Sequence, residues 1–116
     1  MKLVYISHPY TGDEVKNRKE TREMCKQIQH QHRDWCLYCP LDNHIFAEQA
    51  GYEYSRFIEW DLFMLEKCDI AVFCGDWERS NGCKAEYRKA KELGIKVYFQ
   101  SSQLGVKHGK TRFCHG

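Results

Sequence analysis

Short apolar runs recur along this chain at intervals long enough to hold a helix, and this alternation is the strongest constraint on its fold. The runs occupy residues 2–6, 36–39, 70–74 and 95–99. Strands separated by helical lengths pair in parallel through right-handed crossovers, and the connecting helices then cover the sheet. We therefore predict an α/β protein with a three-layer, flavodoxin- or Rossmann-like fold. Its sheet should have four to five mainly parallel strands, with helices on both faces.

Three segments between these runs have helical patterns. Residues 13–33 are highly charged with a narrow apolar stripe, and residues 54–67 carry a broader one. Residues 82–93 form a third helical pattern that stops before Gly94, a residue suited to the left-handed position after a helix. Residues 40–52 show no repeat or low-complexity character, and we interpret them as a long irregular connection of the kind that is often functional.

The chain has 116 residues, the length of one domain that buries about two-thirds of its unfolded surface. We assign residues 1–100 to this domain and residues 101–116 to a tail that is loosely ordered or forms an oligomer contact. The 18 basic and 16 acidic residues give a net charge of +2, too weak to indicate a polymeric nucleic-acid partner. The chain contains neither a membrane-spanning run nor a signal-peptide pattern, so we expect a cytoplasmic protein without membrane association.

Seven cysteines are an odd number, and some, such as Cys68 and Cys74, fall in predicted core elements. For a protein without a signal peptide this favours reduced, structural thiols. Two alternatives remain open at Cys36 and Cys39, which are spaced as Cys-x-x-Cys: a metal site with His44, or a redox pair. A redox pair requires its first cysteine at a helix start, whereas this motif resembles the end of a strand entering a loop. We therefore predict no metal and no other cofactor.

Residues 69–86 form an apolar strand, a polar loop containing glycine and the start of a charged helix. In open parallel sheets ligands bind beyond the carboxyl ends of the strands, so this loop should face the loop at residues 7–12. Both loops offer backbone amides near helix starts, which suit an anion. Neither has the glycine pattern of an ATPase or dinucleotide site. Glu86, taken alone, is an ordinary acidic residue near a helix start, where the helix dipole favours it.

Asp61 is less easily explained by helix stability. It lies one helical turn from Phe57, Ile58 and Leu65, which places it on or beside an apolar face. A carboxylate there is costly to bury unless something uses it. Desolvation should raise its pKa, which is what an acid acting at neutral pH needs.

Four motifs, in their order and spacing, resemble the nucleoside 2-deoxyribosyltransferase-like superfamily. They are KLVYISHPYTG at residues 2–12, IEWDLFML around Asp61, CDIAVF at 68–73 and SNGCKAEYRKA at 80–90. The resemblance spans residues 2–99 and is greatest to the short bacterial and phage branch, related to the deoxynucleoside 5′-monophosphate N-glycosidases. It implies cleavage or transfer at the N-glycosidic bond of a (deoxy)nucleoside or its 5′-monophosphate.

The resemblance also implies roles for four residues. Glu86 would attack the anomeric carbon, Asp61 would assist the leaving base, Tyr5 would orient the nucleophile and Ser80 would help to hold a 5′-phosphate. These roles fit the chemistry, because a carboxylate can capture the oxocarbenium-like transition state while an acid protonates the departing base. Whether water or a second base accepts the sugar stays open. The alternative is a non-catalytic protein that binds or sequesters a nucleotide in the same pocket.

The predicted substrate-binding residues come from the two loops. They are Ser7, His8, Tyr10, Thr11, Gly12, Ser80, Asn81 and Gly82. The chain departs from the superfamily at 7–10, where relatives often have a turn of small residues. It departs again at Cys83 and Lys84, which replace small residues and narrow the predicted pocket. The resemblance further implies a homo-oligomer, because a neighbouring subunit commonly completes the site, and it implies no cofactor.

Overall fold

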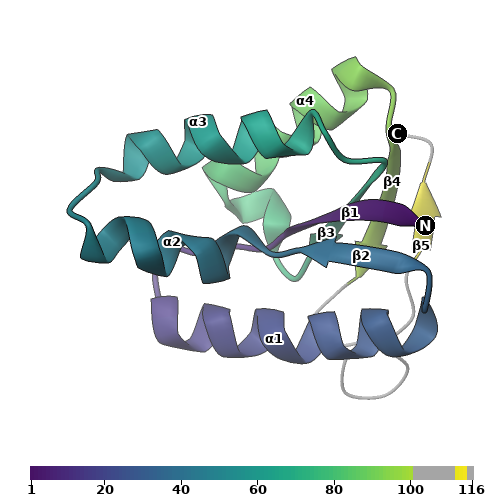
Figure 1. Cartoon of the computed structure of the whole chain (residues 1–116), viewed down its shortest axis with the longest axis horizontal. Helices are drawn as coiled ribbons and strands as arrows, with labels where there is room; N and C mark the ends of the chain where they lie inside the picture. The colour runs from purple at the N-terminus through teal and green to yellow at the C-terminus, as the bar shows by residue number, and fades with distance from the viewer. Residues whose placement is uncertain (101–111, 115–116) are drawn as a thin grey trace.

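The computed structural model describes residues 1–100 and the strand at residues 112–114, and it has a central sheet flanked by helices (Figure 1). The strands are β1 (Lys2–Ser7), β2 (Trp35–Tyr38), β3 (Ile70–Cys74), β4 (Lys96–Gln100) and β5 (Arg112–Cys114). The helices are α1 (Glu14–Gln31), α2 (Pro40–Gln49), α3 (Tyr54–Leu65) and α4 (Asn81–Leu93), with a 3-10 turn, η1 (Trp77–Arg79).

The strands are ordered β2-β1-β3-β4-β5 across the sheet. The first four are parallel, and β5 runs antiparallel to β4. The prediction of an α/β fold with a mainly parallel sheet of four to five strands is therefore confirmed. Within the predicted tail at 101–116, the strand β5 was not anticipated, and the rest of that tail and its predicted oligomer contact lie outside the described residues.

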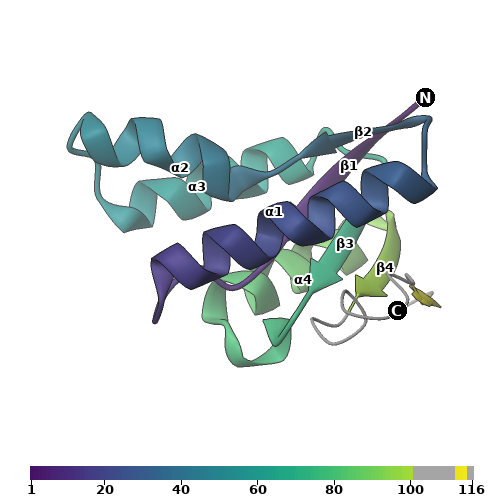
Figure 2. The ribbon, with the colours of Figure 1, turned by 90° about the horizontal axis from the view of Figure 1, so that it is seen from below.

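Alternate residues of the central strands build the core on one face of the sheet. Val4 and Ile6 of β1 and Val72 of β3 point to this face. They pack against Met24 and Ile28, which lie on the buried stripe of α1. Figure 2 shows α1 running along this face, with α4 behind the sheet.

The intervening residues build the second core on the opposite face. Tyr5 of β1 and Phe73 of β3 pack there with Leu65 of α3 and Ala90 of α4. The sheet is thus the middle of three layers, because successive side chains of a strand point to opposite faces. The predicted buried face of α3 is confirmed, including the buried Asp61.

The segment that we predicted to be irregular, residues 40–52, is mostly the helix α2, and that prediction was wrong. Pro40 occupies the first turn, where its missing N–H costs nothing, and Asp42 lies at the positive end of the helix dipole. Adjacent Asp and Asn residues favour turns, but here they lie in the first helical turn. The helix buries Leu41 and His44, so it places a histidine where an exposed loop was expected.

The crevice at the carboxyl edge of the sheet forms where β1 and β3 lie side by side. The chain leaves β1 for α1 on one face and leaves β3 for α4 on the other, which is the arrangement that opens ligand sites in such sheets. Ser80 caps α4 by accepting a hydrogen bond from the Cys83 amide at 3.2 Å, and Gly94 ends it at φ 70°, as predicted. Over the part of the chain that the structure describes, no helix is both long enough and apolar enough to span a bilayer.

Candidate functional site

The carboxylate of Glu86 is buried and held by two hydroxyl groups. It projects from α4 toward β1, where the Tyr5 hydroxyl donates to Oε2 and the Ser7 hydroxyl donates to Oε1 at 2.7 Å. Tyr5 and Ser7 are two residues apart in one strand, so their side chains share a face of the sheet. Because each oxygen of Glu86 has its own donor, the orientation of the carboxylate is fixed.

The protonation of Glu86 reflects a balance between burial and these donors. Burial raises the pKa of Glu86 to about 7, although the hydrogen bonds from Tyr5 and Ser7 act in the opposite direction, and the nearby Asp61 carboxylate raises it further. Burial, followed by the Glu86 and Asp61 carboxylates, raises the pKa of Tyr5 well above its ordinary value, so Tyr5 stays a neutral donor. Near pH 7 both the protonated and the ionised form of Glu86 are therefore populated.

This pKa predicts how the free energy of unfolding depends on pH. The folded state binds the Glu86 proton more tightly than the unfolded chain, where the pKa is near 4.5. The stabilisation from this proton is complete below about pH 4.5 and is lost as the pH rises through about 7, amounting to about 3 kcal/mol. Urea unfolding should show wild type losing stability relative to Glu86→Gln over about pH 5 to 8. A difference independent of pH would contradict the raised pKa.

Asp61 reaches the same cavity from α3 and pairs with a histidine of α2. Its Oδ2 lies 2.9 Å from His44 Nε2, and both side chains are nearly buried. Burial raises the pKa of Asp61, and the hydrogen bond and charge of His44 partly oppose this. His44 Nδ1 is buried and has no hydrogen-bond partner among the described residues. The pair therefore combines a carboxyl group of raised pKa with a buried ring nitrogen that has no hydrogen-bond partner among the described residues.

His44 is the site residue that the sequence did not reveal. The sequence indicates it only as a third ligand in the metal alternative, because residues 40–52 are predicted to be a loop. The signal was present: Leu41 and His44 are three residues apart after a proline that can begin a helix, and both are buried in α2. Recognition of this helix would have placed His44 on its inner face.

The cavity beside the two carboxylates has a volume of only about 30 Å³, the space of about one water molecule. Its polar lining comes from four elements and the two loops: Ser7, His8, Tyr10, His44, Tyr54, Asp61, Ser80, Cys83 and Glu86. Gly82 also lines it, and a Cβ on Gly82 would lie 3.5 Å from the Tyr54 hydroxyl. That distance is an ordinary van der Waals contact, so an alanine at position 82 would pack against the tyrosine without displacing it.

Contacts with neighbouring helices hold the Tyr10 side chain beside the small cavity. Its ring lies parallel to that of Tyr54, with centroids 6.3 Å apart, and edge-on to His44 at 5.5 Å. Its hydroxyl donates to Glu48 of α2 and accepts from the Arg18 guanidinium of α1 at 2.9 Å. Arg18 and Glu48 also form an ion pair at 3.2 Å. Tyr10 is thus tied to both helices.

The structure distributes the predicted binding residues over two cavities. Those lining the small cavity are Ser7, His8, Tyr10, Ser80 and Gly82, and those lining a second, larger pocket are His8, Thr11 and Ser80. Gly12, at φ 109°, and Asn81, the first residue of α4, line neither of these cavities. Among the described residues, His8 and Ser80 line both cavities.

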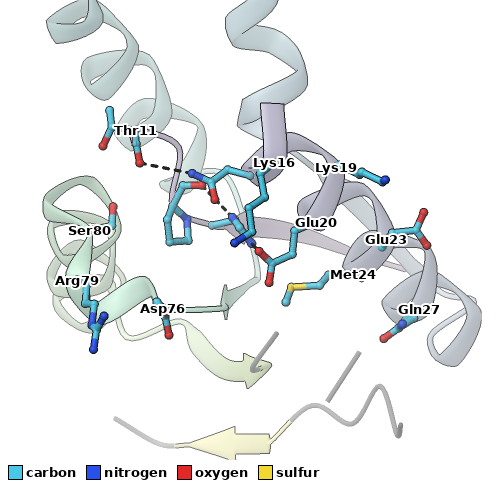
Figure 3. Close-up of a pocket in the computed structure, with 13 residues that line it drawn as sticks. Thr11, Lys16, Lys19, Glu20, Glu23, Met24, Gln27, Asp76, Arg79 and Ser80 are labelled. Carbon is cyan, nitrogen blue, oxygen red and sulfur yellow. Dashed lines mark hydrogen bonds and ion pairs between the residues drawn. The ribbon is translucent and has the colours of Figure 1, made fainter. Parts of the chain in front are cut away.

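The second pocket has a volume of about 750 Å³ and lies between α1 and the connection from β3 to α4. Figure 3 shows α1 supplying one wall and the segment from Asp76 to Ser80 supplying the other. The buried His8 and Met24 form part of its floor, and exposed charged residues surround its mouth. This volume is within the range of ordinary small-molecule sites.

The two alternatives for the Cys-x-x-Cys motif, a metal site and a redox pair, depend on Cys36, Cys39 and His44. In the structure these three side chains have different surroundings. His44 pairs with Asp61, the Cys39 side chain interacts with Cys25, and Cys36 is exposed in β2. Over residues 1–100, no group of three or more histidine, cysteine or acidic side chains is placed to hold a metal ion. Cys39, and not Cys36, precedes the helix α2, and all six cysteines in this range are free thiols.

Fold and site together define an α/β protein of Rossmann-like architecture with a buried carboxylate site at the carboxyl edge of its parallel sheet. A family model covers almost this entire domain, matching residues 2–100. The chain belongs to that family, which is described as a domain of unknown function, DUF7768. No curated protein matches the chain.

Proposed function

We propose that this protein cleaves or transfers the N-glycosidic bond of a (deoxy)nucleoside or nucleoside 5′-monophosphate, with Glu86 as nucleophile. The observation that carries the proposal is the Glu86 carboxylate, held by Tyr5 and Ser7 in a cavity that it shares with the Asp61–His44 pair. The motif resemblance to the nucleoside 2-deoxyribosyltransferase-like superfamily independently suggests Glu86, Asp61 and Tyr5 for these roles.

In the first step a Glu86 oxygen attacks the anomeric carbon, and the bond from that carbon to the base nitrogen breaks. The base leaves with the bonding electron pair and takes a proton from Asp61, whose raised pKa favours the protonated form. The product is an ester between Glu86 and the sugar. Tyr5 and Ser7 hold the carboxylate in line with the anomeric carbon before attack, so that little reorganisation is needed.

In the second step water or another base attacks the same carbon and releases Glu86. Asp61, now ionised, removes the proton of the incoming nucleophile, and His44 stabilises its negative charge. These two reaction steps require no cofactor. Acceptance of water gives hydrolysis, and acceptance of a base gives transfer.

Substrate entry requires Tyr10 to move, because a cavity of about 30 Å³ cannot hold a sugar. Release of the Tyr10 hydroxyl from Glu48 and Arg18 would open the space next to Tyr54. The two parallel rings would then be available to stack on a base.

The direct experiment is incubation with a panel of 2′-deoxynucleosides and their 5′-monophosphates, following free base by chromatography. We expect base release from at least one substrate, and base exchange on addition of a second base if the enzyme is a transferase. Absence of release or exchange across the panel, with the protein folded, would exclude the enzymatic proposal.

The alternative is a non-catalytic protein that binds or sequesters a nucleotide in this site. It would use the same cavity and would need the same movement of Tyr10. Saturable binding of a nucleotide without any base release would support non-catalytic binding and contradict the enzymatic proposal.

We further propose a homo-oligomer that forms through aromatic residues of the α2–α3 region. Trp60 and Phe63 lie one turn apart on α3, Tyr52 contacts Trp60, and Phe63 is 57% exposed. Adjacent exposed aromatic residues are typical of interaction surfaces. Light scattering should give a mass above that of one chain, reduced to the monomer by Phe63→Glu. The control Val15→Glu, on the exposed side of α1, should leave the mass unchanged, and a monomeric wild type would contradict the proposal.

We also propose that the protein is cytoplasmic. It is supported by the free thiols of the six cysteines within residues 1–100.

A further inference from the structure

The helices α1 and α2 meet along a seam that charged side chains bridge. Arg18 of α1 pairs with Glu48 of α2 at 3.2 Å, and Arg22 of α1 pairs with Asp42 of α2 at the same distance. Positions 18, 22 and 25 lie one above another on α1, because residues three or four apart share a face of a helix. Cys25 is therefore the next residue along the face of α1 that meets α2.

At this end of the seam the thiol of Cys25 meets the thiol of Cys39. The two side chains interact directly, and Cys39 is the capping residue that precedes the first turn of α2. The ion pair of Arg22 with Asp42 lies three residues away from each cysteine, and it holds the two helices together beside the thiols. Both thiols are free and only partly buried, whereas the nearby Cys74 is 0% exposed. A small solute can therefore reach the pair.

The surroundings of the two thiols give them different roles. The hydrogen bond from Cys25 lowers the pKa of Cys39, whereas burial and the charge of Asp42 raise it. The backbone amides of Leu41 and Asp42, at the start of α2, lower the Cys39 pKa further. The same thiol–thiol bond, together with burial, raises the pKa of Cys25, so the proton stays on Cys25. A thiolate at a helix start is the form that reacts with oxidants, and a thiol beside it can resolve the product.

We propose that Cys25 and Cys39 are an oxidative modification site, at which hydrogen peroxide forms a reversible disulfide between α1 and the start of α2. The Cys39 thiolate attacks one peroxide oxygen, the O–O bond breaks, and the other oxygen leaves as water after taking up a proton. The Cys25 sulfur then attacks the resulting sulfenic acid, the S–O bond breaks, and the hydroxyl leaves as water with the Cys25 proton. The two thiols lose two electrons and two protons in all, and the peroxide is reduced to two water molecules.

The disulfide would restrain the seam that Tyr10 spans. The Tyr10 hydroxyl donates to Glu48 of α2 and accepts from Arg18 of α1, so its release is easiest when the two helices can separate. In the reduced protein the neighbouring pair of Arg22 with Asp42 is half-exposed, and salt weakens such pairs. A covalent bond at the same seam is not screened, and it would hold Tyr10 beside the small cavity. This consequence rests on the proposed function, in which Tyr10 moves to admit substrate, whereas formation of the disulfide does not.

The test is oxidation of the full chain by a small excess of hydrogen peroxide, followed by blocking of free thiols, intact mass spectrometry and peptide mapping. We expect a loss of two hydrogen atoms and one bridge, between the peptides that contain Cys25 and Cys39, with dithiothreitol restoring both thiols. The urea midpoint of the oxidised protein should exceed that of the reduced protein, because the bridge restricts the unfolded chain. A bridge that includes Cys36 or Cys74, or no bridge in the folded protein, would overturn the proposal.

Single variants separate the two thiols. Cys25→Ser should form no bridge and should leave Cys39 as a sulfenic acid that dimedone traps, whereas Cys39→Ser should give neither product at this site. Cys36→Ser is the matched control, because Cys36 is the exposed cysteine of the adjacent strand β2, and this variant should form the bridge as wild type does. Loss of the bridge in Cys36→Ser, or its persistence in Cys25→Ser, would contradict the assignment. Thermal melts establish that each variant is folded.

The restraint on Tyr10 is tested with the substrate that releases base fastest. Oxidation should slow release at least about tenfold in wild type, because the site must open for each turnover, and should have little effect in Cys25→Ser. Equal rates for the oxidised and reduced wild type would contradict the restraint. Absence of base release from both forms would contradict the proposed function alone, because the bridge is measured by mass.

Discussion

Glu86→Gln is expected to lower the rate of base release by at least about three orders of magnitude, the largest effect of any single substitution in this chain. An amide cannot form the sugar ester, although it occupies the same space, accepts a hydrogen bond from one of the two hydroxyls and can donate to the other. The measurement is single-turnover release of base from the best substrate of the panel. Glu92→Gln is the matched control, because Glu92 lies on the same helix and is exposed.

If Glu86→Gln released base at a rate within tenfold of wild type, Glu86 would not be the nucleophile. That result would not contradict the proposal that the site binds a nucleotide. Unfolding of Glu86→Gln would not explain a lower rate of base release, because this variant should be at least as stable as wild type near neutral pH. The reason is that glutamine avoids the cost of a buried charge that the ionised glutamate incurs.

The second large effect is expected for Asp61→Asn, which should lower base release by about 10² to 10⁴ because it removes the acid that protonates the leaving base. The effect should depend on the leaving group. A substrate with an activated group such as nitrophenolate needs no protonation, so its cleavage should fall far less. Asp42→Asn is the control, since Asp42 is an exposed carboxylate of α2 that pairs with Arg22.

An equal loss for natural and activated substrates would contradict the role of Asp61 as acid and indicate a structural role. A merely structural effect would also lower the thermal stability in proportion to the lost activity. The difference between the two substrates is therefore the informative quantity, since both reactions use the same folded protein.

The layers of the fold could be predicted because the strongest signals in this sequence are local. The run at residues 70–74 is apolar throughout, as a strand covered on both faces must be. Asp61 could be singled out for a related reason: a charged residue on an apolar helical face stands out against its neighbours. The pairing of Tyr5 with Glu86 needed the motif resemblance, because the two residues are 81 positions apart.

Other features depend on contacts that no local pattern reports. The helix α2 begins with residues that also form turns, and its packing on α3 decides between the two. The strand β5 has only three residues and depends on the free edge of β4. The distribution of the predicted binding residues over two cavities depends on the orientation of His8, which lines both cavities and contacts the Pro9 carbonyl, and no local sequence pattern reports that orientation.

The alternation of side chains along β1 limits how this protein can change during evolution. Val4 and Ile6 face one core, while Tyr5 and Ser7 face Glu86. Insertion or deletion of one residue within β1 would exchange the two sets, placing aliphatic side chains against the carboxylate and hydroxyl groups in the core. Substitutions in this strand can be selected one at a time, but a change of its length would abolish core and site together. Length variation in the family should therefore accumulate in the connections and spare β1.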